Sequence, residues 1–176
     1  MRFDVVLRTF SDFFEKEGIR FAVIGGLAIH AWGRSRSTQD VDFTIDAVNR
    51  SRVIAFAESV GYRTIFVSDG YSNHESPSPD WGRLDFMYVT GDTAERVFAT
   101  ASTKPLVGDI QAPVPRPELL AAMKATAMKN APQRVLTDAG DVKFLLGLPG
   151  VDRDAIRAYF ARQGLAELFD AIERHP

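Results

Sequence analysis

Two aspartates one position apart, in the run Asp40-Val41-Asp42-Phe43, are the residues whose types and spacing most clearly indicate chemistry. Acidic and apolar residues alternate in this run, which is typical of a β-strand with one buried face. Side chains at positions i and i+2 of a strand point to the same face, roughly 6 to 7 Å apart along the chain. Two carboxylates held so close repel each other unless a cation lies between them. The pair therefore predicts a site for Mg²⁺, which takes oxygen ligands from carboxylates and substrate phosphates.

Two further features extend this site. Asp85 lies in a predicted strand, 83–89, from which it would complete the ligand set and accept a proton from an attacking hydroxyl. Gly25 and Gly26 end an apolar run and precede a predicted helix. Glycine lets the backbone approach a phosphate closely, and the start of a helix offers unpaired N–H groups. A triphosphate placed between the glycines and the aspartates would meet hydrogen-bond donors at one end and cations at the other.

The elements that must position these residues follow from hydrophobic periodicity and from glycine and proline breaks. Up to about residue 115 the pattern predicts a mixed α/β domain with strands at 20–24, 40–45, 62–67, 83–89 and 110–114, and with helices at 3–17, 27–32, 50–60 and 93–101. The polar segment 68–80 is predicted to be a loop. Residues 116–176 predict a helical lobe, with helices at 118–128, 135–146, 152–163 and 165–173.

Composition narrows the class of protein. The chain has 176 residues, a net charge of −2 and no cysteine. Disulfides, thiolate zinc sites and cysteine nucleophiles are therefore excluded, and a reducing, cytoplasmic location is expected. No apolar run reaches the roughly 18 residues of a membrane span, so no membrane association is expected. Because DNA-coating proteins are usually basic, we expect no non-specific DNA binding.

The spacing of these motifs resembles a known signature. The run Ile24-Gly25-Gly26, thirteen residues, and then Asp40-Val41-Asp42-Phe43 is similar to that of the polymerase-β-type nucleotidyltransferase superfamily, and Leu84-Asp85-Phe86 matches its third acidic strand. The resemblance implies a nucleotidyltransferase fold and two metal ions, Mg²⁺ or alternatively Mn²⁺. It also implies transfer of a nucleoside monophosphate from an NTP to a hydroxyl. Asp40 and Asp42 would bind the metals, and Asp85 would bind the ion at the nucleophile and act as the base.

A narrower resemblance covers residues 18–148. The stretch 21–42 is similar to minimal nucleotidyltransferases of the AbiEii toxin type, in which Gly-Gly-x-Ala precedes Arg-x-Thr-x-Asp-apolar-Asp, here with Arg36 and Thr38. Their helical lobe carries a lysine that Lys124 would match. It also carries a basic residue followed by Lys-Asp-x-x-Asp, represented here by Arg134, Thr137, Asp138 and Asp141, with threonine in place of the usual lysine. This resemblance implies that Gly25, Gly26, Arg36, Thr38 and Lys124 bind the nucleotide.

Several alternatives stay open. The aspartates fit an edge strand with solvated acids, the glycines fit a plain tight turn, and Lys124 fits a surface lysine. The acceptor could be a tRNA end, a protein hydroxyl (in a toxin, or in an antitoxin-like modifier of a partner) or a small molecule such as an aminoglycoside. A different class is a non-catalytic NTP-binding or partner-binding module. The presence of all three acids favours the enzyme.

Overall fold

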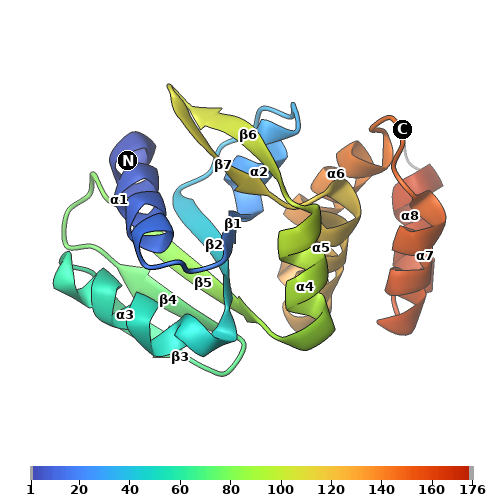
Figure 1. The fold of residues 1–176 in the computed structure, drawn as a ribbon. Helices are drawn as coiled ribbons and strands as arrows, with labels where there is room; N and C mark the ends of the chain where they lie inside the picture. The colour runs from blue at the N-terminus through green and yellow to red at the C-terminus, as the bar shows by residue number, and fades with distance from the viewer. Residues whose placement is uncertain (1, 175–176) are drawn as a thin grey trace. The chain divides into compact units, whose positions relative to one another are not determined.

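The computed structural model describes residues 2–174, and the chain folds into two compact units, Met1–Pro115 and Arg116–Pro176 (Figure 1). The first unit is built on a five-stranded sheet with the order β1-β2-β5-β4-β3. The strands span Phe21–Val23 (β1), Asp40–Asp46 (β2), Arg63–Val67 (β3), Tyr71–Glu75 (β4) and Arg83–Val89 (β5). Strands β2 and β5 are parallel and the other pairs are antiparallel, so the sheet is mixed.

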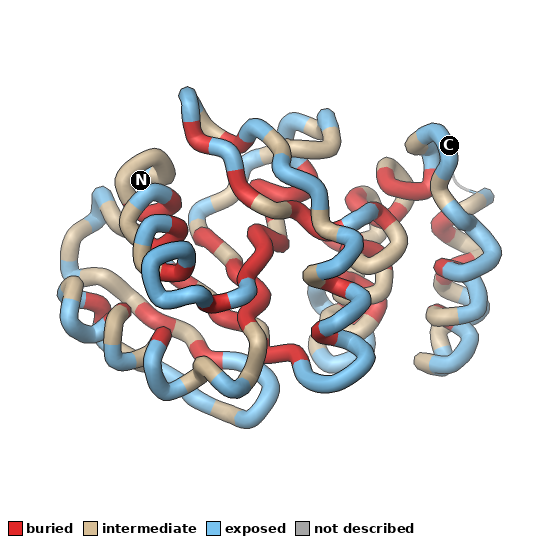
Figure 2. Tube along the Cα trace, viewed as in Figure 1, coloured by how far each residue is buried: buried red, intermediate tan, exposed pale blue. Residues whose placement is uncertain are grey.

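Helices α1 (Phe3–Lys16) and α3 (Arg50–Ser59) contribute aromatic side chains to the core on one face of this sheet. The apolar residues of α1 recur every three or four positions, and Phe10 is fully buried. Its ring lies 6.1 Å from that of Phe43 on β2, 5.9 Å from that of Phe86 on β5 and 5.4 Å from that of Phe56 on α3. Figure 2 shows in red the buried residues, which recur along α1 and the central strands. Because strand side chains alternate, the neighbours of Phe43 and Phe86 face the other way.

The remaining elements of the first unit connect and flank the sheet. They are helix α2 (Gly25–Ala31), the 3₁₀ turn η1 (Ala47–Asn49), helix α4 (Gly91–Thr100) and a hairpin of β6 (Ser102–Val107) and β7 (Ile110–Val114). Trp32 links α2 to this hairpin, because its indole nitrogen donates to the Pro115 carbonyl at 3.0 Å and its ring lies 3.7 Å from Lys104 Nζ.

The second unit is helical. It contains α5 (Pro117–Asn130), the 3₁₀ turn η2 (Pro132–Arg134), α6 (Val135–Leu146), α7 (Arg153–Arg162) and α8 (Ala166–Arg174). Phe160 on α7 and Phe169 on α8 are both fully buried, with ring centroids 5.3 Å apart. Among residues 2–174, no helix is both long enough and apolar enough to cross a membrane.

The structure corrects three expectations from the sequence. Residues 71–75, predicted as loop, form strand β4, whose polar side chains are satisfied by neighbours on both faces of the sheet. Strand β6 was not predicted, and it pairs with β7 in a local hairpin. Helix α2 begins at Gly25 rather than at residue 27, so the two glycines form its first turn instead of a separate turn before it.

Candidate metal and nucleotide site

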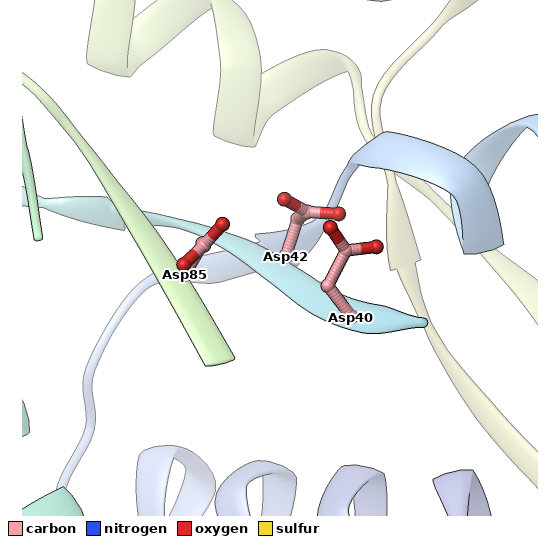
Figure 3. Close-up of side chains that lie close together, drawn as sticks. All are labelled: Asp40, Asp42 and Asp85. Atoms are coloured by element: carbon pink, nitrogen blue, oxygen red, sulfur yellow. The ribbon is translucent and has the colours of Figure 1, made fainter. Parts of the chain in front are cut away.

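The three predicted aspartates come together on the sheet face opposite Phe43 and Phe86 (Figure 3). Strands β2 and β5 are parallel neighbours, and their register places Asp42 directly beside Asp85. Asp40 lies two positions before Asp42 on the same face. One carboxylate oxygen from each of the three residues lies within 4.8 Å of the others. The spacing predicted from sequence therefore produces a single cluster.

The donor set of this cluster fits a divalent cation of the Mg²⁺ type. With Mg–O distances of about 2.1 Å in an octahedron, adjacent ligand oxygens are about 3.0 Å apart and opposite ones about 4.2 Å. The oxygens of the cluster, within 4.8 Å of one another, are close enough together to share such an ion. All three aspartates are half-buried. Water and substrate oxygens can therefore supply the further ligands that Mg²⁺ keeps.

Two of the carboxylates are held by neutral hydrogen-bond donors. Thr38 Oγ1 donates to Asp40 Oδ1 at 2.6 Å, and Asn73 Nδ2 donates to Asp85 Oδ1 at 2.8 Å. A neutral donor fixes the orientation of a carboxylate without cancelling its charge. These two contacts therefore help to orient Asp40 and Asp85 within the cluster.

Gly25 allows the third carboxylate to lie against the backbone of α2. The residue has a φ of +63°, and a Cβ added there would lie 1.9 Å from Asp42 Oδ2 and 2.6 Å from its Cγ. With Asp42 in this position, a side chain larger than hydrogen would collide with its carboxylate. The first turn of α2 and the carboxylate cluster are consequently in direct contact, at the place where the sequence predicts a polyphosphate.

The loop before β2 packs over the second glycine. A Cβ at Gly26 would lie 2.6 Å from Thr38 Oγ1 and 3.0 Å from Arg36 Nη2. Arg36 Nη1 donates to the Ser37 carbonyl at 3.1 Å. The predicted nucleotide-binding residues Gly25, Gly26, Arg36 and Thr38 thus lie together beside Asp40 and Asp42.

Asn73 is a site residue that sequence reasoning missed. It lies on β4, opposite Asp85 in the register, in the segment that was predicted to be a loop. No spacing rule connects an asparagine to an aspartate twelve residues away unless the strand pairing is known. The available signal was the alternation within Tyr71-Ser72-Asn73-His74, which the polar character of the residues obscures.

On the other face of β4, a chain of hydrogen bonds runs from the exposed Glu58 to the buried His74 and Ser72. Thr64 Oγ1 donates to Glu58 Oε1 at 2.7 Å, so it accepts from His74 Nδ1 at 3.1 Å. His74 Nε2 then accepts from Ser72 Oγ at 2.8 Å, and Tyr88 donates to Ser72 at 2.6 Å. Burial lowers the pKa of His74 from 6.5 to about 4, although the Glu58 carboxylate acts in the opposite direction. His74 is therefore neutral at pH 7 and anchors the strand that presents Asn73.

Lys124 lies in the second unit, on α5, with its side chain 9% exposed. Its Nζ is 2.7 Å from both Asp138 Oδ1 and Asp141 Oδ2, and Arg134 Nε donates to Asp138 Oδ2 at 2.9 Å. These positive side chains lower the pKa of Asp138 against the opposing effect of its burial. Lys124 is thus a buried, paired lysine rather than a surface one, and its ammonium group lies between two carboxylates of its own unit.

Comparison with solved structures identifies the fold. No protein-family model and no curated sequence matches the chain. The solution structure of the antibiotic-resistance factor ANT(2'')-Ia superposes with a TM-score of 0.69 at 17% identity, covering 97% of both chains. A crystal structure of ANT(2'')-Ia with adenylyl-2''-tobramycin gives a TM-score of 0.57 at 16% identity, covering 96% of this chain and 92% of that one.

The lincosamide antibiotic adenylyltransferase LnuA, bound to lincomycin, gives a TM-score of 0.55 at 18% identity, covering 80% of this chain and 94% of that chain. Sequence identity at this level is evidence for the fold alone. The predicted architecture, a mixed sheet flanked by helices with a C-terminal helical lobe, agrees with these similarities. The chain has the nucleotidyltransferase fold.

Proposed function

We propose that the protein is a metal-dependent nucleotidyltransferase that moves a nucleoside monophosphate from an NTP to a hydroxyl group and releases pyrophosphate. The observation that carries the proposal is the convergence of Asp40, Asp42 and Asp85 within 4.8 Å, in contact with a glycine that no other residue could replace without a clash. The fold shared with adenylyltransferases supports it.

In this proposal the three aspartates have different roles in metal binding and proton transfer. Asp40 and Asp42 would hold two Mg²⁺ ions, with Mn²⁺ as a substitute, and Asp85 would share the ion nearer the acceptor. Bound ions would lower the pKa of the attacking hydroxyl and neutralise charge on the phosphates. Asp85 would accept the hydroxyl proton while Asn73 holds its Oδ1. The acceptor oxygen forms a bond to the α-phosphorus as the bond from that phosphorus to pyrophosphate breaks.

Gly25 and Gly26 would carry the triphosphate, since the absent side chains leave room for phosphate oxygens at the backbone. Arg36 would offset phosphate charge, and Thr38 would keep Asp40 in place. Lys124 is a further proposed nucleotide ligand, although its Nζ already lies 2.7 Å from both Asp138 and Asp141. A cytoplasmic location, where NTP and Mg²⁺ are both supplied, is part of the proposal.

Label transfer tests the proposal directly. The chain is incubated with each α-³²P-labelled NTP, Mg²⁺ or Mn²⁺, and a mixture of tRNA, protein and aminoglycoside acceptors. We expect transfer that falls by about 10²- to 10³-fold or more in Asp40→Ala and Asp42→Ala, because charge stabilisation in the transition state is lost. Asp12→Ala, at an exposed position on α1, is the matched control and should transfer normally.

The acceptor that becomes labelled separates the remaining interpretations. Labelled tRNA or protein would fit a toxin–antitoxin component of the AbiEii type, and a labelled small molecule would fit a modifying enzyme. Absence of label with every NTP and acceptor would contradict the proposal and favour a non-catalytic NTP-binding or partner-binding module.

A further inference from the structure

An exposed aromatic pair lies near the carboxylate cluster. Phe66 of β3 and Tyr71 of β4 stack with ring centroids 5.0 Å apart and an interplanar angle of 26°. The two residues are 45% and 49% exposed. Large aromatic surfaces that face solvent together are typical of ligand-binding positions. The cluster of aspartates does not use either residue.

Strand register places this pair on the same face of the sheet as the aspartates. Asn73 points to that face, because its side chain reaches Asp85. Tyr71 precedes Asn73 by two positions and therefore shares its face, and Phe66 is the register partner of Asn73 on β3. Tyr71 pairs with Met87, so it is a diagonal neighbour of Asp85 at about 7 to 8 Å.

The geometry of the proposed reaction also requires the acceptor to approach the aspartates from the side of β4 and β3. In phosphoryl-type transfer, the attacking and leaving oxygens are roughly in line across the phosphorus. The glycines that would carry the triphosphate follow β1, which borders β2 on the side away from β5. The attacking hydroxyl must then arrive from the opposite side, over β4 and β3. This step rests on the proposed function.

We propose that Phe66 and Tyr71 form the acceptor platform and that the acceptor is a small ring-shaped molecule with hydroxyl groups, of the glycoside class. Aromatic faces pack against the apolar face of a ring while its hydroxyls stay free to react.

Charge near the platform favours such a molecule over RNA. Phe66 and Tyr71 are uncharged. Arg63, whose register partner Glu75 shares the face of Asn73, lies 3.5 Å from Glu75 and is bridged to it. Recognition of a polynucleotide draws largely on cations that contact its phosphates. A neutral aromatic surface with paired charges suits a compact acceptor.

Binding and transfer measured side by side test the platform. Tobramycin, lincomycin, methyl glucoside and a tRNA transcript are titrated into the full chain by isothermal calorimetry, and KM values for acceptor and NTP are measured. We expect at least one of the three small molecules to bind, and we expect Phe66→Ala/Tyr71→Ala to weaken that binding by about 10-fold or more, since both ring faces are lost. The KM for NTP should change less than about 2-fold, because the proposed nucleotide ligands lie on other elements.

Val67→Ala is the matched control. Val67 is 47% exposed and adjacent to Phe66, but it pairs with buried Ser72 and so belongs to the opposite face. It should leave acceptor binding unchanged, and Tyr71→Phe should retain it.

The outcomes separate the platform from the proposed function. Loss of small-molecule binding in the double variant supports the platform, whether or not nucleotide is transferred. Absence of nucleotide transfer would contradict the proposed function but not the platform. Wild-type protein that binds none of the three small molecules, equal binding by the double variant, or transfer only to tRNA would overturn the platform.

Discussion

Gly25 determines how closely the backbone of α2 can approach Asp42. A side chain at this position would cost stability in two ways, through its positive φ and through a clash with Asp42, and comparison with Gly18 separates the two. Gly18 has nearly the same φ, +62°, but a Cβ there would meet nothing within 4 Å. We expect Gly18→Ala to cost about 1 to 2 kcal/mol in the free energy of unfolding, the usual cost of a left-handed residue. Gly25→Ala should cost at least about 1 kcal/mol more, because its Cβ would displace Asp42.

Urea unfolding of both glycine variants measures the difference. Equal losses of stability would mean that Asp42 moves aside without cost and that the contact between α2 and the cluster is unimportant.

Asn73 acts on the reaction through Asp85, as a positioning residue. We expect Asn73→Ala to raise the Mg²⁺ concentration needed for half-maximal transfer by about 10-fold, in line with the loss of other groups that orient metal ligands. The measurement is the Mg²⁺ dependence of label transfer at saturating NTP. Asn49→Ala, outside the cluster, should leave it unchanged. If Asn73→Ala lowers stability but leaves the Mg²⁺ dependence unaltered, the role of Asn73 is structural only.

Some of these residues could be predicted from the sequence because their proximity is local. Others could not, because their proximity depends on how the strands pair. Asp40 and Asp42 share a face through strand periodicity alone, so their proximity is a local property. Asp85 required a guess that its strand was adjacent, and the family resemblance supplied it. The contact of Asn73 with Asp85 depends on strand register, which a single sequence does not fix.

At the scale of elements, β4 shows why a strand with two polar faces reads as a loop. Its inward residues Ser72 and His74 belong to a buried hydrogen-bond chain, and its outward Asn73 belongs to the cluster. Strand β5 was predicted with its observed bounds because Leu84, Phe86 and Tyr88 recur at every second position. Apolar alternation predicts strands that pack on a core, whereas polar residues satisfied by tertiary partners give no such pattern.

The buried His74 makes stability depend on pH. Its pKa falls from 6.5 to about 4 on folding, so between these values the unfolded chain binds a proton that the folded chain does not. The free energy of unfolding should therefore decrease as pH falls from about 6.5 to about 4, by roughly 3 kcal/mol from this group. Above pH 6.5 the contribution is complete.

Urea unfolding between pH 4.5 and 7.5 tests the role of His74. We expect His74→Gln to be less stable at pH 7.5 and to show a shallower loss with acid. His30→Gln, at an exposed position on α2, should keep the wild-type slope. A slope that survives in His74→Gln would assign the acid sensitivity to other groups.

At the scale of the whole molecule, the second unit depends on a buried charge cluster. Lys124→Ala would leave Asp138 and Asp141 buried without their shared cation. We expect the free energy of unfolding of the helical unit to fall by about 3 to 5 kcal/mol. Far-UV circular dichroism measures the helices, and the fluorescence of Trp32 and Trp81, both in the first unit, measures the unfolding of that unit. Lys129→Ala, at an exposed lysine of the same helix, should cost less than about 1 kcal/mol.

An unchanged helical melting transition in Lys124→Ala would show that the cluster does not hold the unit together. Weaker NTP binding at unchanged stability would instead support the nucleotide-binding role of Lys124.

The fold as a whole was more predictable than its details. The order of helices and strands follows hydrophobic period, which persists where identity to structures of the same fold is only 17%. Segment ends, the β6–β7 hairpin and the pairing of β4 depend on contacts between distant residues. Those contacts are set by the packed molecule and not by any local stretch.

Mn²⁺ binding to the intact chain tests the central claim, that Asp40, Asp42 and Asp85 share divalent cations. Free Mn²⁺ is followed by electron paramagnetic resonance in the presence of a non-hydrolysable ATP analogue, for wild type, Asp42→Asn, Asp85→Asn and the control Asp12→Asn. We expect wild type and the control to bind Mn²⁺ equally, and the two cluster variants to bind it at least about 10-fold more weakly. Wild-type protein that binds no Mn²⁺, or cluster variants that bind it as tightly as wild type, would contradict the account.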